Sequence, residues 1–454
     1  MIVAGAAPRS AWGRTEADVL IIGAGLAGLN AAHFLEQAGA RVAILEGERR
    51  VGGRLHTLDD LPGAPDAGGI QVGAGYTRLH RIAAELEVAL DSGPGEGAGR
   101  VQVPGNLYHV NGVSVPSSGW AESAANHLPD TERESEPASL LRRYARAFPA
   151  LADTAAWLDA DPALDVSVEE ALRSTGASVE ARRLIEANFN GTSLAAMSQL
   201  HLARTFTLFR SQPGPISTIA GGSQRLPEAM AARLSVTPRV GQVVTGIEEA
   251  EDGVTVTTQA GTLHARHVIC TIPFAALRTI DVRTPVPPAA ARMMAALPYT
   301  RASFAYIAAK TPFWNEDGLP RTLWTDEPLL GRVFILGDDP AMLKLWTTGA
   351  GADLLDRMPA EAAKARIVAA IEAARPAAKG QLEVLRFYSW QRSPFARGIY
   401  HHIGTGQAAD LASTTRYEGR RLHFAGEHLA QQSSGMEGAL ETGERSARRV
   451  AALL

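Results

Sequence analysis

The sequence predicts an α/β protein in which a doubly wound parallel-sheet domain is joined to a second, α+β domain with a mixed sheet and a helical insert. Three observations predict this class. The chain has 454 residues, which is too long for one hydrophobic core. It begins with a strand, a glycine-rich turn, a helix and another strand over residues 18–46. Strand-like patterns return later in the chain, after a polar, helix-prone stretch at 120–210.

Composition excludes several classes of protein. Hydrophobic residues make up 46% and charged residues 20%, as in ordinary soluble domains. The net charge is -4 without a long basic run, so we expect no nucleic-acid partner. The single cysteine, Cys270 in "HVICTIP", precludes an internal disulfide and is expected to be a core thiol. No segment has the length and hydrophobicity of a membrane anchor, and the first sixteen residues look like a loose leader, not a signal peptide. We therefore expect a cytoplasmic protein.

The first domain carries a dinucleotide-binding motif. "ADVLIIG" is an apolar run typical of a buried strand, and "GAGLAG" then places Gly23, Gly25 and Gly28 in G-x-G-x-x-G spacing. Gly23 allows the tight turn, Gly25 lets a pyrophosphate approach the backbone, and Gly28 lets the helix pack close to the strand. The helix N-terminus that follows offers N–H groups and a positive dipole end to phosphates. This order predicts a Rossmann-type domain.

Two further features narrow the choice of nucleotide. "ARVAILE" ends in Glu46, whose carboxylate can accept hydrogen bonds from ribose hydroxyls and argues against a 2′-phosphate. NAD and FAD remain. The tail "RRVGGRLHT" adds Gly52 and Gly53, which bring backbone close to a ligand, and Arg54, a fixed cation.

Several motifs, in order, resemble the flavin amine oxidase superfamily, which includes monoamine, polyamine and L-amino-acid oxidases. They are "E-x-x-x-x-x-G-G-R", "DAGGIQVG" at 66–73, and the closing "LHFAGE" and "GMEGALETGERSARRV". The resemblance covers nearly the whole chain and implies bound FAD. Family members with covalent flavin use a cysteine just before a conserved tyrosine, and Ile399 stands there before Tyr400, so we expect noncovalent FAD.

The resemblance also implies a division of the chain. The FAD-binding domain would comprise 17–80, 216–290 and 391–454, with a mainly helical substrate-domain segment at 81–215 and a substrate-binding sheet segment at 291–390. A capping box, Ser167 with Glu170, marks a helix start in the helical segment. "GPGEGAG" at 93–99 follows no strand and is expected to be a loop, so no second dinucleotide site is predicted.

Cofactor-binding residues follow from these motifs. Glu427 would bind FAD at its ribityl chain or its pyrophosphate. The backbone of Val244 would bind the adenine, and Trp390 would pack beside the flavin ring. The Met436 N–H and the helix dipole behind it would stabilise negative charge on the reduced flavin. The complete set is Gly23, Gly25, Gly28, Glu46, Gly53, Arg54, Gly69, Val244, Trp390, Gly426, Glu427 and Met436.

The substrate side departs from the family pattern. Tyr400 is one expected wall of an aromatic cage, but the second wall's place holds Gly435, which opens extra room. Phe304 stands where the family has a lysine that holds a water and assists oxygen reduction, so reaction with oxygen is expected to be slow. Gln71 stands where amino-acid oxidases have a carboxylate-clamping arginine, which disfavours an α-amino acid.

Other polar residues near these motifs are weaker candidates. Lys310 and Arg78 are expected to be solvated cations. His56, His401 and His402 are candidates for substrate contact. No metal-ligand spacing is found.

The sequence therefore predicts an FAD-dependent oxidation of an apolar or aromatic amine, with Tyr400 and Phe304 as catalytic residues and Gln71, Tyr400, Phe304 and Gly435 as substrate-binding residues. Hydride would pass from the carbon next to nitrogen to flavin N5, giving an imine. Oxygen or another acceptor would reoxidise the flavin, and a homodimer is left open. Two alternatives remain: oxidation of a non-amine activated C–H or of an amino acid, and a flavoprotein binding module without turnover.

Overall fold

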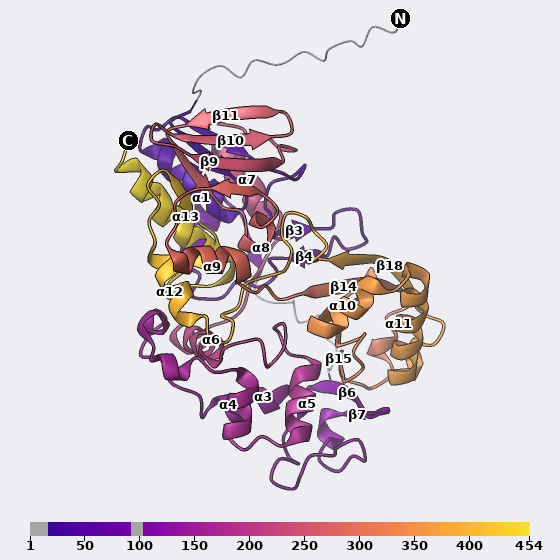
Figure 1. Ribbon diagram of the computed structural model, residues 1–454. Helices are drawn as coiled ribbons and strands as arrows, with labels where there is room; N and C mark the ends of the chain where they lie inside the picture. The colour runs from indigo at the N-terminus through magenta and orange to yellow at the C-terminus, as the bar shows by residue number, and fades with distance from the viewer. Residues whose placement is uncertain (1–16, 92–102) are drawn as a thin grey trace, which may run out of the picture.

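The computed structural model describes residues 17–91 and 103–454. A parallel sheet and its helices lie at one end of the molecule, and a larger mixed sheet lies beside them (Figure 1). The predicted α/β class, with a mixed sheet and a helical insert in the second domain, is confirmed. The expected leader and the loop at 93–99 lie outside the described residues.

The four-stranded parallel sheet begins the domain that contains the glycine motif. Its order is β19 (Leu422–Phe424), β12 (His267–Cys270), β1 (Val19–Ile22) and β2 (Val42–Leu45). Every residue of β1 is buried, because both faces of the sheet are covered. One face packs on α1 (Leu26–Gln37) and α13 (Gly435–Ala451). Cys270 is buried in β12, as expected.

The other face of the parallel sheet packs on a second sheet. Its order is β11 (Gly261–Ala265), β10 (Val254–Thr258), β9 (Val244–Glu249) and β13 (Asp281–Arg283). Alternate valines and isoleucines of β9 and β10 point into the core shared with β1.

The larger sheet has seven strands. Its order is β18 (Leu382–Ser389), β14 (Ala302–Ala309), β17 (Ala341–Thr348), β16 (Arg332–Asp338), β15 (Thr322–Thr325), β6 (Asn106–Val110) and β7 (Val113–Pro116). β6 and β7 come from the stretch expected to be mainly helical. They form a hairpin through Asn111 and Gly112, both at positive φ, and an Asn-Gly pair is a strong hairpin signal that the sequence analysis did not use.

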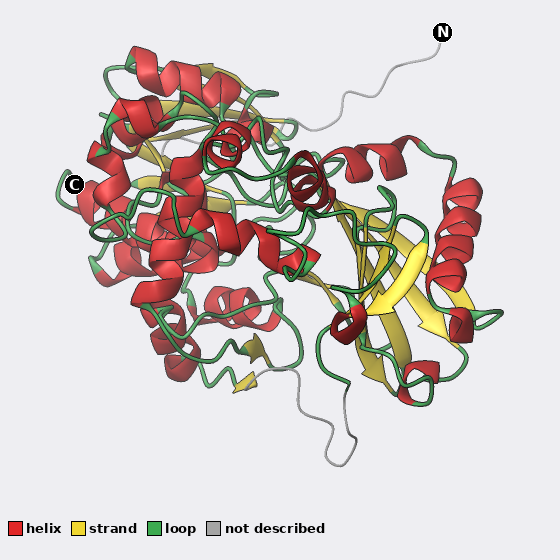
Figure 2. Cartoon of the chain, turned by 90° about the horizontal axis from the view of Figure 1, so that it is seen from below, coloured by secondary structure: helices red, strands yellow, loops and turns green. Residues whose placement is uncertain are grey.

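The large sheet has two different faces because side chains alternate along a strand. On one face, Ala305, Leu343 and Leu345 pack under the helices α10 (Gly349–Arg357) and α11 (Ala360–Ala374), which cover that side of the sheet in Figure 2. On the other face lie Phe304 and Tyr306 of β14 with their neighbours from β17. This second face looks toward the parallel-sheet domain.

A helical layer packs against the β6–β15 end of the sheet through the buried side chains of Tyr108, Trp120 and Trp324. It contains α3 (Leu140–Ala145), α4 (Val168–Ser174), α5 (Val179–Ala187) and α6 (Gln199–Ser211). The Ser167 hydroxyl accepts the Glu170 N–H at 3.0 Å, so the predicted cap of α4 is confirmed.

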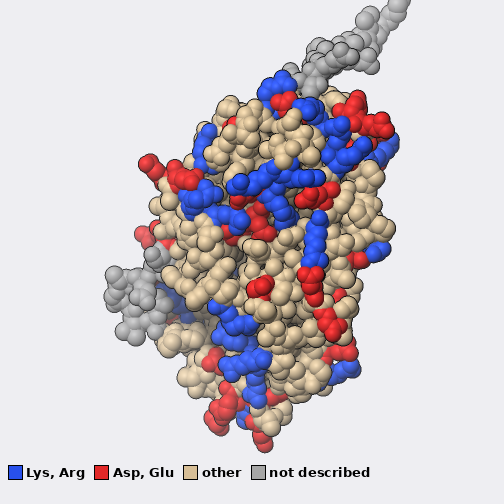
Figure 3. All heavy atoms as spheres, turned by 90° about the vertical axis from the view of Figure 1, so that its left-hand side faces the viewer, with Lys and Arg blue, Asp and Glu red and all other residues tan. Residues whose placement is uncertain are grey.

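The remaining elements connect the two domains or cover the parallel-sheet domain. They are α2 (Thr77–Glu85), α7 (Arg225–Arg233), α8 (Phe274–Leu277), α9 (Pro288–Ala296), α12 (Ala408–Arg416), β3 (His56–Thr57), β4 (Asp66–Gly68), β5 (Leu90–Asp91) and β8 (Thr218–Ile219). Across residues 17–91 and 103–454, none of the helices combines the length and hydrophobicity needed to cross a bilayer. On the face in Figure 3, acidic and basic side chains are interspersed.

Candidate functional site

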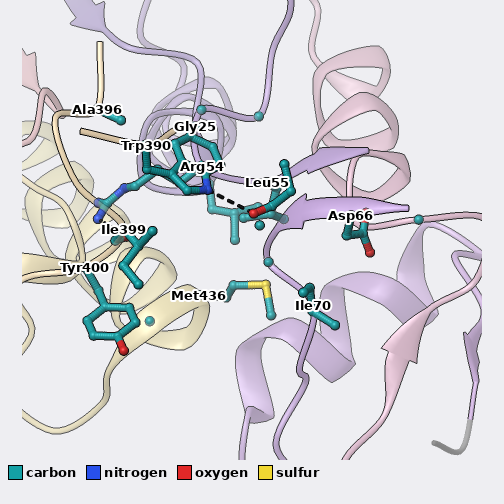
Figure 4. A pocket seen from close by; sticks show the side chains of 18 of the residues that line it. Gly25, Arg54, Leu55, Asp66, Ile70, Trp390, Ala396, Ile399, Tyr400 and Met436 are labelled. Carbon is teal, nitrogen blue, oxygen red and sulfur yellow. Dashed lines mark hydrogen bonds between the residues drawn. The ribbon is translucent and has the colours of Figure 1, made fainter. Parts of the chain in front are cut away.

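A large cavity lies between the parallel-sheet domain and the inward face of the seven-stranded sheet. Its volume is about 1370 Å³, which exceeds the roughly 300–1,000 Å³ of a pocket for one drug-sized ligand. Residues of the first βα turn, the "GGR" segment, the α13 start and strands β14, β16 and β17 line it. Figure 4 shows Gly25, Arg54, Trp390, Tyr400 and Met436 around this space. The cavity therefore has room for a dinucleotide and a second small molecule.

The glycine motif forms one wall of the cavity. Gly23 has φ +104°, and a Cβ on it would lie 2.3 Å from the Thr271 hydroxyl oxygen. A Cβ on Gly28 would lie 1.9 Å from the Gly23 carbonyl oxygen, so helix α1 touches the turn backbone directly. A Cβ on Gly25 would meet no protein atom closer than 3.9 Å, because this residue faces the open cavity. Gly23 and Gly28 are therefore in positions where a side chain would clash, and the approach of a pyrophosphate at Gly25 stays a prediction.

Glu46 directly follows β2 at the same wall and is 6% exposed. Its carboxylate oxygens accept the N–H of Ala24 at 2.8 Å and of Glu48 at 2.7 Å. Burial raises the pKa of Glu46, and these backbone N–H groups oppose the rise. The carboxylate is held rigidly at the cavity wall, where it can also accept hydroxyl groups of a ribose.

Arg54 and the buried Glu427 form an ion pair in the cavity lining. Arg54 Nη1 donates to Glu427 Oε1 at 2.8 Å and to the Ile399 carbonyl oxygen at 2.9 Å. His401 lies 2.5 Å from the other Glu427 oxygen, Nδ1 to Oε2. Burial alone would raise the pKa of Glu427, but His401 and Arg54 hold it well below its usual range. The carboxylate therefore stays ionised and fixes the Arg54 guanidinium.

The other predicted cofactor residues lie along the same cavity. Trp390 is 1% exposed and donates its indole N–H to the Ala67 carbonyl at 2.9 Å, the dashed line in Figure 4. Cavity-lining positions also include Gly53, Gly69, Val244, Gly426 and Met436. Met436 is in the first turn of α13, so the helix N-terminus points at the cavity. Cys270 is not part of the cavity lining, and Ile399 is, so no thiol is available there for covalent attachment.

The predicted substrate residues all line the cavity, although they come from different parts of the fold. Tyr400 lines the cavity, and burial raises its pKa to about 12, although nearby Arg332 lowers it. Phe304 is fully buried on β14 and stacks against Trp346 with ring centroids 4.6 Å apart. Gln71 lines the cavity but is exposed, so it belongs to the rim.

Gly435 also lines the cavity, and its backbone explains the absent side chain. Its φ is +53°, a conformation that other residues adopt only with strain. A Cβ there would lie 3.4 Å from the Tyr76 hydroxyl oxygen, so Tyr76 of the segment before α2 approaches the room expected to be open.

Lys344 is a cavity residue that the motifs did not predict, because it lies on β17, the strand beside that of Phe304, and not on the strand of Phe304 itself. Its Nζ is 4.3 Å from the Phe304 ring centroid and donates to the Asp66 carbonyl at 2.7 Å. Burial lowers the pKa of Lys344 to about 7. A lysine therefore does lie beside Phe304, at the cavity wall.

Other expectations changed as well. His56, His401 and His402 are not brought to the cavity wall. Burial lowers the pKa of His56 to about 4, and that of His402 to about 3. Arg78 is not a free solvated cation, because it pairs with Glu437 and Glu444 and ties α2 to α13. Lys310 is exposed, as expected. Among the residues with described coordinates, no group of His, Cys, Asp or Glu is arranged to hold a metal ion.

Comparison with known proteins identifies the family. Residues 26–451 match the family described as flavin containing amine oxidoreductase. A protein of Mycobacterium tuberculosis that is described as flavin-containing monoamine oxidase AofH is 30% identical to this chain. The match covers 96% of this chain and 97% of that protein. The flavin-dependent L-tryptophan oxidase RebO of Lentzea aerocolonigenes is 26% identical, over 97% and 99%. The structure of cyclohexylamine oxidase from Brevibacterium oxydans has the same fold, with a TM-score of 0.80 and 23% identity over 97% of this chain and 99% of that one. The cavity geometry and these matches agree: this chain is an FAD-dependent oxidoreductase of the flavin-containing amine oxidoreductase family.

Proposed function

We propose that this chain oxidises an amine with an apolar or aromatic body, at the carbon next to the nitrogen, to give an imine. FAD, when bound, accepts the hydride at N5. The glycine motif, Glu46, Arg54, Glu427 and the α13 start would hold FAD, and the β14–β16–β17 face would hold the amine. The observation that carries this proposal is one cavity lined by both sets of residues.

The nature of the sheet-side wall supports an apolar or aromatic body. Phe304, Phe334, Met342 and Trp346 line it, and Tyr400, from the loop before α12, lines the same cavity. Such a wall buries apolar surface at about 25 cal/mol per Å² and offers ring faces for stacking. The relatives described as a monoamine oxidase and an L-tryptophan oxidase fit this range of substrates.

Lys344 gives the site a proton acceptor. Amines are protonated in water near neutral pH, and an ammonium group has no lone pair to assist loss of a hydride from the adjacent carbon. With a pKa of about 7, a large fraction of Lys344 is neutral at that pH, and its Nζ can take the proton from the substrate. Above that pKa the rate of flavin reduction is expected to be higher.

The remaining residues would act by positioning. Tyr400 and Trp346 would orient the amine, because their rings are held by the fold and exclude water from the carbon that loses hydride. The α13 N-terminus at Met436 would favour the negative charge that remains on the reduced cofactor.

Anaerobic mixing of the purified protein with amines tests the proposal. Loss of the main visible flavin band with aromatic amines, such as benzylamine, phenethylamine and tryptamine, supports it. Bleaching only by non-amine substrates would instead establish oxidation of another activated C–H. No bleaching by any member of the panel, with dithionite still reducing the flavin, would establish a binding module.

The Lys344→Met variant sharpens this test. It should reduce the flavin more slowly and lose the rise in rate near pH 7, while a rise set by the substrate's own amine pKa remains. The Lys310→Met variant is the matched control, since Lys310 is an exposed lysine just beyond β14. An unchanged pH profile in Lys344→Met would exclude Lys344 as the proton acceptor.

A further inference from the structure

The cavity contains an arginine that neither the FAD site nor the oxidation step uses. Arg332 begins β16 and lines the cavity beside Phe334 and Trp346. An arginine has five N–H donors, but only Nη2 of Arg332 finds an acceptor, the Asn190 side-chain oxygen. Its Nε is sealed from solvent without a partner. Most of its donors are therefore unsatisfied within the described chain.

The charge of Arg332 also lacks a counter-ion. Three other arginines of the same domain are paired: Arg321 with Asp338, Arg366 with Glu327, and Arg375 with Asp317. Among the residues described, no carboxylate forms an ion pair with Arg332. Arg332 is partly exposed at the cavity wall, with Nε shielded from solvent, so an anion that enters the cavity would find an unpaired guanidinium there.

A second unsatisfied donor lies next to it. Trp346 is the β17 residue paired in register with Arg332, and its indole N–H is buried without an acceptor. Buried donors are almost always hydrogen-bonded in folded proteins. Two such donors on adjacent strands of one cavity wall indicate that the missing acceptor belongs to a ligand.

Asn190 links Arg332 to the amine-binding region. Its side-chain oxygen accepts from Arg332, and its backbone oxygen accepts from the Tyr400 hydroxyl at 3.4 Å. Tyr400 is the aromatic residue expected beside the amine. An anion bound at Arg332 would therefore lie close to the nitrogen of the substrate.

We propose that Arg332 binds a carboxylate of the substrate, so that the substrate is an amino acid with an apolar or aromatic side chain. This rests on the proposed amine oxidation and narrows it. The neutral Gln71 led us to disfavour an amino acid as substrate. That expectation is reversed here, because the arginine that would bind the carboxylate is on β16 and not in the segment after β4. The planar guanidinium suits a carboxylate, which can accept two parallel N–H bonds from it.

Binding without turnover tests the anion site. Benzoate and the neutral benzamide are titrated into the FAD-loaded protein by calorimetry. Wild type should prefer benzoate, and Arg332→Gln should reduce this preference about tenfold to a hundredfold, as expected for a lost charged hydrogen bond. Arg332→Lys retains the charge but cannot donate two parallel N–H bonds, so its preference for benzoate should lie between those of wild type and Arg332→Gln. Arg366→Gln removes a paired arginine outside the cavity and should bind as wild type does.

Anaerobic flavin reduction tests the substrate class. L-Phenylalanine is compared with phenethylamine, and L-tryptophan with tryptamine. Wild type should favour the amino acid of each pair, and Arg332→Gln should lower that ratio at least tenfold. Two results together would overturn this inference and leave amine oxidation intact. The flavin would be reduced by the amines with no preference for the amino acids, and the affinity for benzoate would be the same in wild type and Arg332→Gln. Benzoate binding that depends on Arg332, without reduction by any amine or amino acid, would retain the anion site and refute the proposed function.

Discussion

Replacing Lys344 by methionine should make the protein more stable and the enzyme slower. Lys344 is 2% exposed, and its pKa falls from 10.5 to about 7. At 1.36 kcal/mol per pKa unit, that shift corresponds to about 5 kcal/mol of destabilisation at pH values where both folded and unfolded states bind the proton. Methionine fills a similar volume and carries no charge.

The cost of burying the Lys344 ammonium depends on pH in a defined direction. Below pH 7 Lys344 is protonated in both the folded and the unfolded state, and the full cost applies. Between pH 7 and 10.5 the unfolded state alone keeps the proton, so the stability of wild type rises with pH. The penalty is about 4 kcal/mol at pH 7 and about 2 kcal/mol at pH 9.

The variant loses one hydrogen bond and the cation–π contacts of the Lys344 Nζ with the rings of Phe304, Tyr306 and Trp346, and we expect favourable contacts of the methionine sulfur with these rings to offset the loss of the cation–π contacts. The Lys344 hydrogen bond to the Asp66 carbonyl contributes about 1 kcal/mol, and the Tyr306 hydroxyl, 2.9 Å away, still donates to that oxygen. Lys344→Met should therefore be more stable than wild type by about 3 kcal/mol at pH 7 and about 1 kcal/mol at pH 9.

Urea denaturation with saturating FAD, followed by tryptophan fluorescence at both pH values, measures this difference. Lys310→Met should show no pH-dependent gain. A Lys344→Met protein that is less stable than wild type at pH 7, or whose advantage does not shrink at pH 9, would refute the reasoning that Lys344 is a strained, functional lysine.

Three further substitutions test separate parts of the structure. Glu427→Gln leaves Arg54 and His401 without their buried carboxylate, so it should cost about 3 kcal/mol at pH 7 in urea denaturation. Because the Glu427 pKa lies below its usual range, that cost should fall as the pH drops below the ordinary carboxyl pKa, and a pH-independent cost would contradict the ion pairing. Gly435→Tyr places a side chain at φ +53° beside Tyr76 and should destabilise the protein by about 1–3 kcal/mol without faster flavin reduction in stopped flow; faster reduction would show that a second aromatic wall is tolerated there. Ser167→Ala removes the cap of α4 and should cost about 1 kcal/mol in urea denaturation with unchanged flavin reduction, whereas no loss of stability would contradict the cap.

The FAD side of the site could be predicted from sequence because its residues are local. Gly23, Gly25 and Gly28 lie in one turn, and their spacing alone specifies a close backbone approach. Glu46 directly follows the next strand of the same unit. Such short-range patterns need no knowledge of the tertiary fold.

The substrate side could not be predicted in the same way. The alternation in "AMLKLWTT" places Met342, Lys344 and Trp346 on one face of β17, but sequence does not reveal that β17 lies beside β14. Arg332 and Asn190 are 142 residues apart and meet only in the folded cavity. Matching motifs along the chain therefore misses residues that reach the site only when distant strands pair in the folded protein.

The most direct measurement is anaerobic titration of the purified yellow protein with phenethylamine and L-phenylalanine, followed at the main visible flavin band. We expect complete bleaching without added reductant, and release of unmodified FAD when the protein is then denatured. A band that persists with both compounds and with the wider amine panel, while dithionite still bleaches it, would contradict amine oxidation in this cavity.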